Sequence, residues 1–160
     1  MNLETVFFIT QIVAAIAVTV SIFYVAFEVR HNTKATKLST YQSLVDSSMQ
    51  ILQSLYNNEE TAAFYHRCLF NNAELTGPEK LRWHAVMITV YRHWDNLLYQ
   101  HKKGSLEDEM WQTYDTTMSQ YLNYKAWADW FTENSHFFSE SLQQSISSKL
   151  KNIQSKDKSI

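Results

Sequence analysis

The stretch TVFFITQIVAAIAVTVSIFYVAF, residues 5–27, decides the fold of this chain. It contains no charged side chain, no proline and no glycine. As a helix with a rise of about 1.5 Å per residue it would extend about 34 Å, enough to cross a hydrocarbon core about 30 Å thick. A core helix of a soluble protein is rarely apolar on all sides over such a length. We therefore predict one transmembrane anchor over residues 1–30.

The residues that flank the apolar run favour an anchor over a cleaved signal peptide. A signal peptide begins with Lys or Arg and ends at a small-x-small site. Here the first four residues hold no basic side chain, and AFEVRH ends the run. Arg30, Lys34 and Lys37 follow it closely. By the positive-inside rule, the N-terminus is expected outside the membrane and the following domain in the cytoplasm.

A stripe of small and hydroxylated residues runs along the predicted span. Thr10, Ala14, Ala17, Ser21 and Tyr24 recur in steps of four and three, which places them on one side of a helix. Small residues let helices approach closely in lipid, and hydroxyls can bond across the contact. We call these five residues the seam and expect it to pack on a second copy or on a partner's helix. The alternative is that a single anchor tolerates such residues anywhere.

No glycine or proline interrupts residues 28–56, where apolar side chains recur at helical spacing. They are Leu38, Tyr41, Val45, Met49, Leu52 and Leu55. We predict that the anchor continues as one long helix into a cytoplasmic helical domain over residues 31–153, with a flexible tail at 154–160. The expected fold class is all-α, with four or five shorter helices packed on the long one.

Turn and capping signals divide the domain. Residues 57–60 should turn the chain before a helix over 60–70. TGPE at 76–79 combines a capping Thr, a first-turn Pro and a Glu three residues after the cap, which is typical of a helix start. Gly104 should end that helix, and Ser105 should cap the next one. Further helices are expected around 127–131 and over 140–153.

The helix that starts at TGPE is predicted to be central, because it is apolar on two sides. One predicted face consists of Trp83, Met87, Val90, Trp94 and Leu97. A second consists of Leu81, Ile88, Tyr91 and Leu98. His93 falls in the narrow polar stripe that remains, and Arg92 and Asp95 could form an ion pair beside the apolar faces.

The segment after the anchor, Arg30-His31-Asn32-Thr33-Lys34-Ala35 followed by Tyr41-Gln42, resembles one in uncharacterised bacterial membrane proteins with a single N-terminal span. In those proteins an R-x-N-T-K-A element follows the anchor, and a helical region rich in Trp and Tyr completes the chain. The similarity covers most of this sequence, including Tyr99-Gln100 and Gly104. It implies an anchor in the bacterial inner membrane and a junction site at Arg30, Asn32, Thr33 and Lys34, and it transfers no catalytic residue.

No catalytic constellation emerges from the sequence. A net charge of −2 and a pI near 6.3 argue against a nucleic-acid binder. Phosphate loops, dinucleotide fingerprints, CxxC and HExxH are missing, and the lone Cys68 lies on an apolar face, as a buried thiol would. Glu-x-x-His, a di-iron pattern, occurs at 28–31 and 133–136 without the apolar face that a bundle core needs. We predict no metal and no cofactor.

These observations predict a membrane-anchored, self-associating helical scaffold or interaction protein without catalysis. Its expected partners are the lipid bilayer, identical copies and an unidentified protein. One alternative is a small homo-oligomeric channel, with Thr10 and Ser21 lining a polar path. Another is a membrane-tethered ligand-binding sensor or enzyme, because Trp and Tyr are enriched in pockets and interfaces as well as in cores. Trp127, Trp130 and Phe131 could alternatively contact lipid headgroups.

Overall fold

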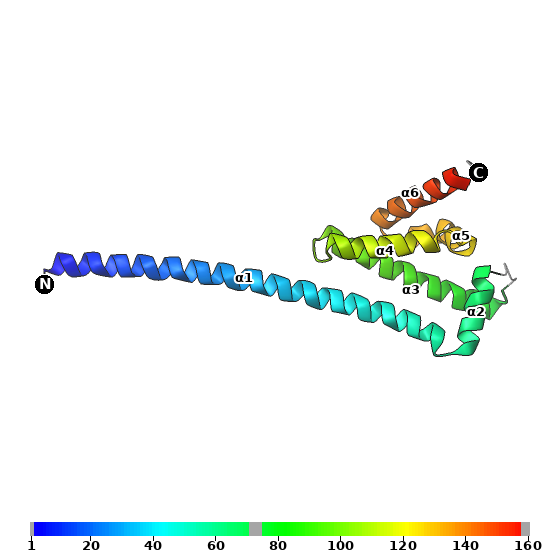
Figure 1. Cartoon of the computed structure of the whole chain (residues 1–160), viewed down its shortest axis with the longest axis horizontal. Coiled ribbons are helices and arrows are strands. Elements are labelled where there is room, and N and C mark those ends of the chain that lie inside the picture. Colours follow the sequence, from blue (N-terminus) through cyan, green and yellow to red (C-terminus); the bar gives the residue numbers. More distant parts are fainter. Residues whose placement is uncertain (1, 71–74, 158–160) are drawn as a thin grey trace. The chain divides into compact units, whose positions relative to one another are not determined.

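The structure, a computed structural model, describes residues 2–70 and 75–157, without the side chains of 54–56 and 156–157 (Figure 1). Every regular element in these ranges is a helix, which confirms the all-α prediction. The elements are α1 (Leu3–Tyr56), α2 (Glu59–Phe70), α3 (Gly77–Lys102), α4 (Asp108–Tyr121), α5 (Lys125–Asn134), the 3-10 helix η1 (Ser135–Phe137) and α6 (Glu140–Asp157).

The chain divides into two compact units, Met1–Ser39 and Thr40–Ile160, and α1 passes from one into the other. The predicted continuity of the long helix is therefore confirmed, while the boundary predicted after residue 30 lies inside the first unit. The described part of that unit is a helix whose apolar stretch is long enough to cross a membrane, and the residues of that stretch are exposed. Its apolar side chains thus have no protein cover in this chain.

In the second unit, the side of α1 that packs overlaps only in part with the apolar residues that recur at helical spacing in the sequence. Leu44 is buried, and the half-buried residues around it include Tyr41, Val45, Ser48 and Ile51. The exposed members of the predicted stripe are Leu38, Met49 and Leu52. Tyr41 and Val45 of that set therefore lie on the packed side, and periodicity alone does not select which neighbouring apolar positions are buried with them. The side chain of Leu55 lies outside the described part.

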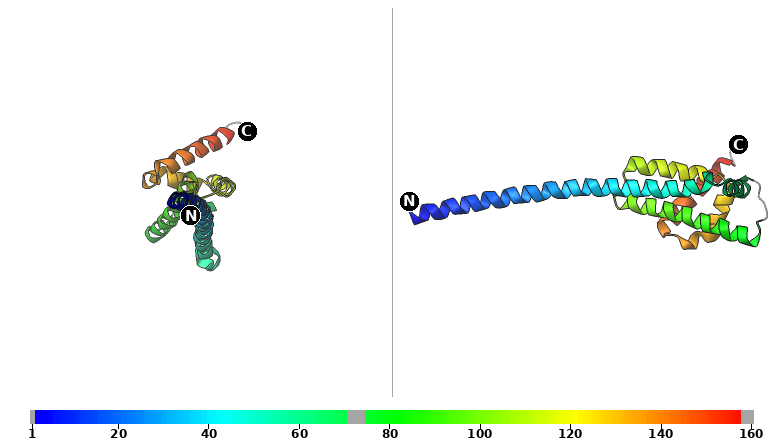
Figure 2. Two further views of the ribbon diagram at one scale, coloured as in Figure 1. Left: turned by 90° about the vertical axis from the view of Figure 1, so that its left-hand side faces the viewer. Right: turned by 90° about the horizontal axis from the view of Figure 1, so that it is seen from below.

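The central position predicted for α3 is confirmed. It packs against both α4 and α6, while α2 packs against α5 (Figures 1 and 2). All five residues of its first predicted face are buried, and so are Tyr91 and Leu98 of the second. Leu81 is an exception. It is exposed because the described elements leave the first turns of α3 uncovered on that side.

Two helix starts show where capping signals succeed and fail. The Glu79 carboxylate accepts hydrogen bonds from the Thr76 backbone N–H (3.0 Å) and hydroxyl (2.9 Å), as the TGPE pattern predicts. Ser105 does not cap α4, which begins three residues later, at Asp108. Gly104, at φ 71°, instead ends α3 so that the N–H groups of residues 105 and 106 bond to the Gln100 carbonyl, and Leu106 is buried.

At the other end of the chain, α6 continues to Asp157, beyond the predicted end at 153.

Candidate functional site

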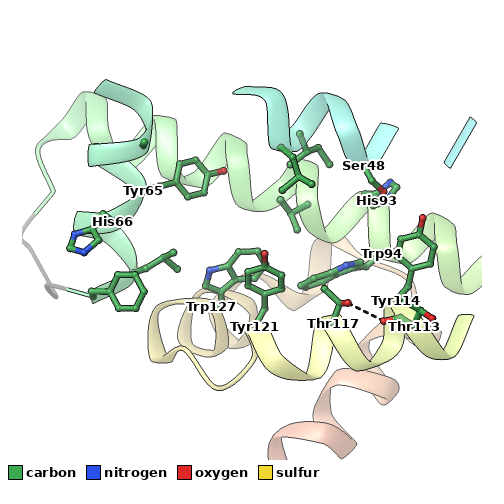
Figure 3. Close-up of a pocket in the computed structure, with 16 residues that line it drawn as sticks. Ser48, Tyr65, His66, His93, Trp94, Thr113, Tyr114, Thr117, Tyr121 and Trp127 are labelled. Carbon is green, nitrogen blue, oxygen red and sulfur yellow. Dashed lines mark hydrogen bonds between the residues drawn. The ribbon is translucent and has the colours of Figure 1, made fainter. Parts of the chain in front are cut away.

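The second unit contains a cavity of about 480 Å³ whose walls come from α1, α2, α3, α4 and α5. Figure 3 shows Tyr65 and His66 of α2 at one end and Ser48 of α1 with His93 of α3 at the other. Tyr121 of α4 lies between these ends. A cavity of this size is within the range of small-molecule sites in proteins.

The body of the cavity is lined by aromatic rings. Tyr121 stacks on Trp127 with 4.6 Å between ring centroids and 22° between planes, and Trp94 lies 5.3 Å from Trp127. Trp94 and Trp127 are buried. Leu69 and Phe70 of α2 add apolar surface at the Tyr65 end. These walls favour an apolar occupant over water.

One end of the cavity is polar. The Ser48 hydroxyl lies 2.8 Å from Nε2 of His93 and donates to the Leu44 carbonyl at 3.0 Å. Since a hydroxyl has one proton, the tautomer consistent with both contacts has Nε2–H of His93 donating to Ser48. Desolvation by burial lowers the pKa of His93 below its ordinary value, so the imidazole is neutral at pH 7. The His93 ring packs edge-on against Tyr114, at 6.3 Å.

Among the described residues that line the cavity, none is Asp, Glu, Lys or Arg, and the titratable cations are the histidines His66 and His93. Burial raises the pKa of Tyr65 to about 12, so its hydroxyl also stays neutral. The Nε1 donor of Trp127 is buried and has no hydrogen-bond partner among the described residues. In Figure 3 this nitrogen lies on the side of the indole that faces His66.

The seam residues are all exposed on the first unit. The Thr10 hydroxyl donates to the Val6 carbonyl at 2.9 Å, and the Ser21 hydroxyl donates to the Ala17 carbonyl at 2.8 Å. Both hydroxyl protons are therefore used within the helix, and only the oxygen lone pairs remain for a second helix. The helix surface is hollowed over Ala17 and Ser21, and this hollow continues toward Val25 and away from Tyr24.

The junction residues do not form a cluster. Arg30, Asn32, Thr33 and Lys34 are exposed on successive sides of an unbroken helix. The Thr33 hydroxyl donates to its own helix, at the Val29 carbonyl, 2.8 Å away. These residues thus form a charged and polar collar that follows the apolar stretch of α1.

The structure also places three groups considered in the sequence analysis: a thiol, an aromatic cluster and a possible ion pair. Cys68 is buried and its thiol pKa is raised by burial, as expected of a structural thiol. Trp127, Trp130 and Phe131 are buried in the core, so the alternative that they contact headgroups is wrong. Asp95 accepts hydrogen bonds from Ser139 and forms no ion pair with Arg92 in the described structure.

The two Glu-x-x-His pairs lie on different elements and in different units. The second pair does not share one α-helix, because Glu133 belongs to α5 and His136 to η1. Across residues 2–70 and 75–157, no group of three or more His, Cys, Asp or Glu side chains is placed to hold a metal ion.

The sequence missed the cavity itself. His93, which the sequence places in a narrow polar stripe, is half-buried and hydrogen-bonded to Ser48 of α1. The available signal was a Ser at position 48, one turn after Leu44, within an otherwise apolar stripe. Reading it would have required knowing which stripe of α1 packs on α3.

Comparisons of the chain with protein-family models, with curated proteins and with solved structures returned no match. The similarity of the Arg30–Ala35 segment to uncharacterised bacterial membrane proteins therefore stays a prediction.

Proposed function

We propose that this chain is a membrane-anchored scaffold that self-associates through its span and holds a helical domain at the cytoplasmic face of a bacterial inner membrane. The observation that carries the proposal is the exposure of the apolar stretch of α1, none of which is buried by the rest of the chain. Exposed apolar surface of this extent needs lipid or another helix as its cover.

Self-association is supported by the hollow over Ala17 and Ser21. In lipid, helices associate by close packing and by hydrogen bonding, since lipid tails are as apolar as the side chains. The hydroxyl protons of Thr10 and Ser21 are already bonded within the helix, so close packing at the small residues provides the main attraction. The proposed role is assembly, without catalysis.

The test replaces the small seam residues by a large one. The double variant Ala14→Leu, Ala17→Leu should lose crosslinked oligomers in native membranes. Its matched control is Ala15→Leu, Thr19→Leu, which adds similar bulk on the opposite side of the same helix and should leave the oligomers unchanged. Equal crosslinking in both variants would exclude the seam as the interface.

Orientation and retention of the span need their own measurements. An alkaline phosphatase reporter, active only outside the cytoplasm, should be inactive when fused after residue 160 and active when fused before residue 1. The intact mass of the protein extracted from membranes should include residues 1–30. A mass that lacks them would identify the stretch as a cleaved signal sequence.

A further inference from the structure

We propose that the cavity of the second unit is a binding site for an uncharged, mainly apolar small molecule that carries a hydrogen-bonding oxygen. This inference goes beyond the scaffold role and does not depend on self-association. It rests on the volume of the cavity, its aromatic walls, the lack of Asp, Glu, Lys and Arg among the described lining residues, and the polar pair of Ser48 and His93 at one end.

The charge of the ligand follows from the walls. A carboxylate or ammonium group placed between the aromatic rings would lose its hydration and find no Asp, Glu, Lys or Arg among the described lining residues, and the exposed His66 lies at the α2 end of the cavity. His93 is neutral at pH 7, since desolvation lowers its pKa. An uncharged ligand loses little hydration and gains contact with the rings of Trp94, Tyr121 and Trp127.

The polar groups define where the ligand carries its oxygen. At one end, Ser48 and His93 are already bonded to each other at 2.8 Å. They can accept an additional donor through the Ser48 lone pairs or through Nδ1 of His93. Nε1 of Trp127 is also without a partner among the described residues, but it is buried behind the wall and is not exposed to the cavity. The oxygen of the ligand is therefore expected at the end of the cavity formed by Ser48 and His93.

The shape of the site favours an elongated molecule. Figure 3 shows the lining residues extending from His66 on α2 to Thr113 and Tyr114 on α4, with Trp127 and Trp94 in between. The aromatic walls suit either planar rings or an acyl chain. We commit to a small molecule over a docked protein segment because Ser48 and His93 lie inside the cavity, where a compact ligand can reach them.

The test uses two photoreactive probes of nearly equal shape on the full-length protein in lipid nanodiscs. 4-(Hydroxymethyl)benzophenone is uncharged and carries one hydroxyl, whereas 4-benzoylbenzoate carries a carboxylate at the same position. After illumination, the labelled peptides are mapped by mass spectrometry. We expect saturable labelling of the lining segments of α3 and α4 by the uncharged probe and about tenfold less by the carboxylate, the factor for about 1.4 kcal/mol of binding free energy.

Two pairs of variants locate the labelling. Ala62→Trp fills the cavity from α2 and should reduce labelling of α3 and α4 about tenfold. The control Ala63→Trp changes the next residue, which is exposed and does not line the cavity. From the opposite wall, Thr117→Phe should have the same effect as Ala62→Trp, and Thr116→Phe should have none.

The proposal is overturned if both probes label the lining segments equally, if labelling is confined to residues 5–27, or if neither filling variant changes it. It is also overturned if a filling variant changes the mass of the oligomer while the uncharged probe fails to label the wild type, because the cavity then receives a second copy of the chain. Should one filling variant fail to fold, the other pair and the two-probe comparison still decide the question.

Discussion

The hydroxyl of Tyr91 on α3 donates a hydrogen bond to the backbone carbonyl of Trp127 on α5, 3.0 Å away. Tyr91 is fully buried, and its ring stacks on Trp130 with 5.6 Å between centroids and 8° between planes. The ring of Phe131, next to Trp130 on α5, lies 4.8 Å from the Tyr91 ring between centroids. Burial raises the pKa of the Tyr91 hydroxyl far above its ordinary value, so it remains a protonated donor. One side chain thus joins the central helix to α5 by ring contacts and one hydrogen bond.

We expect Tyr91→Phe to lower the free energy of unfolding of the second unit by about 1 kcal/mol, because the ring contacts remain and one buried hydrogen bond is lost. Tyr91→Ala should lower it by about 3–5 kcal/mol, because the ring is lost as well. All five tryptophans lie between residues 83 and 130, so their fluorescence during urea unfolding reports on this unit. The control is Tyr99→Phe on the exposed side of α3, which should change little.

The start of α6 depends on a residue of α3. Asp95 accepts hydrogen bonds from the backbone N–H of Ser139 (3.0 Å) and from its hydroxyl, and the same hydroxyl oxygen accepts from the Leu142 N–H at 3.2 Å. We expect Asp95→Ala and Ser139→Ala each to lower the free energy of unfolding by about 1 kcal/mol. In the double variant the losses should be less than additive, since the two residues share the interaction. Strict additivity would show that they act separately.

The buried stripe of α1 can be checked with two leucines of that helix. Leu44 is 3% exposed and Leu52 is 43% exposed. We expect Leu44→Ala to lower the free energy of unfolding by about 2–5 kcal/mol, because it leaves a cavity in the core. Leu52→Ala should cost about 1 kcal/mol or less. The reverse order in urea titrations would mean that the stripe read from the sequence, which contains Leu52, is the one that packs.

His93 should make the second unit less stable in mild acid. Its pKa is lowered in the folded state, so the unfolded chain binds the proton more readily. Its contribution is complete above the unfolded pKa, about 6.5, and is lost as the pH falls toward the lower folded pKa. We expect the wild type to lose more stability between about pH 7.5 and about pH 5 than His93→Gln, which retains a donor for Ser48 but cannot titrate. Parallel pH profiles would contradict this.

The sequence predicted the elements of this fold well because the decisive signals are local. Three signals determine the structure only within or next to the residues that carry them. They are the uncharged run 5–27, the TGPE helix start at 76–79, and Gly104. The two apolar faces of α3 are also local, because the helical repeat places Trp83, Met87 and Val90 together whatever packs against them.

The candidate site could not be predicted in the same way, because it depends on pairings between distant segments. Ser48 and His93 are 45 residues apart, and their contact follows from which of two adjacent apolar stripes of α1 faces α3. Asp95 and Ser139 are 44 residues apart. Periodicity defines the stripes of a helix but not its rotation against a neighbouring helix. The cavity depends on that rotation, so it could not be predicted from periodicity.

The last helix, α6, packs on the rest of the domain both near its start and along its length. Asp95 holds its first residues, Leu142 and Ile146 are fully buried, and Lys149 donates to Asp115 and Ser119 of α4 at 2.5 and 2.9 Å. A detached α6 segment would keep the side chains that make these contacts. A synthetic peptide of residues 138–157 should therefore dock onto a chain truncated after residue 137, so that the domain can be reconstituted from two pieces.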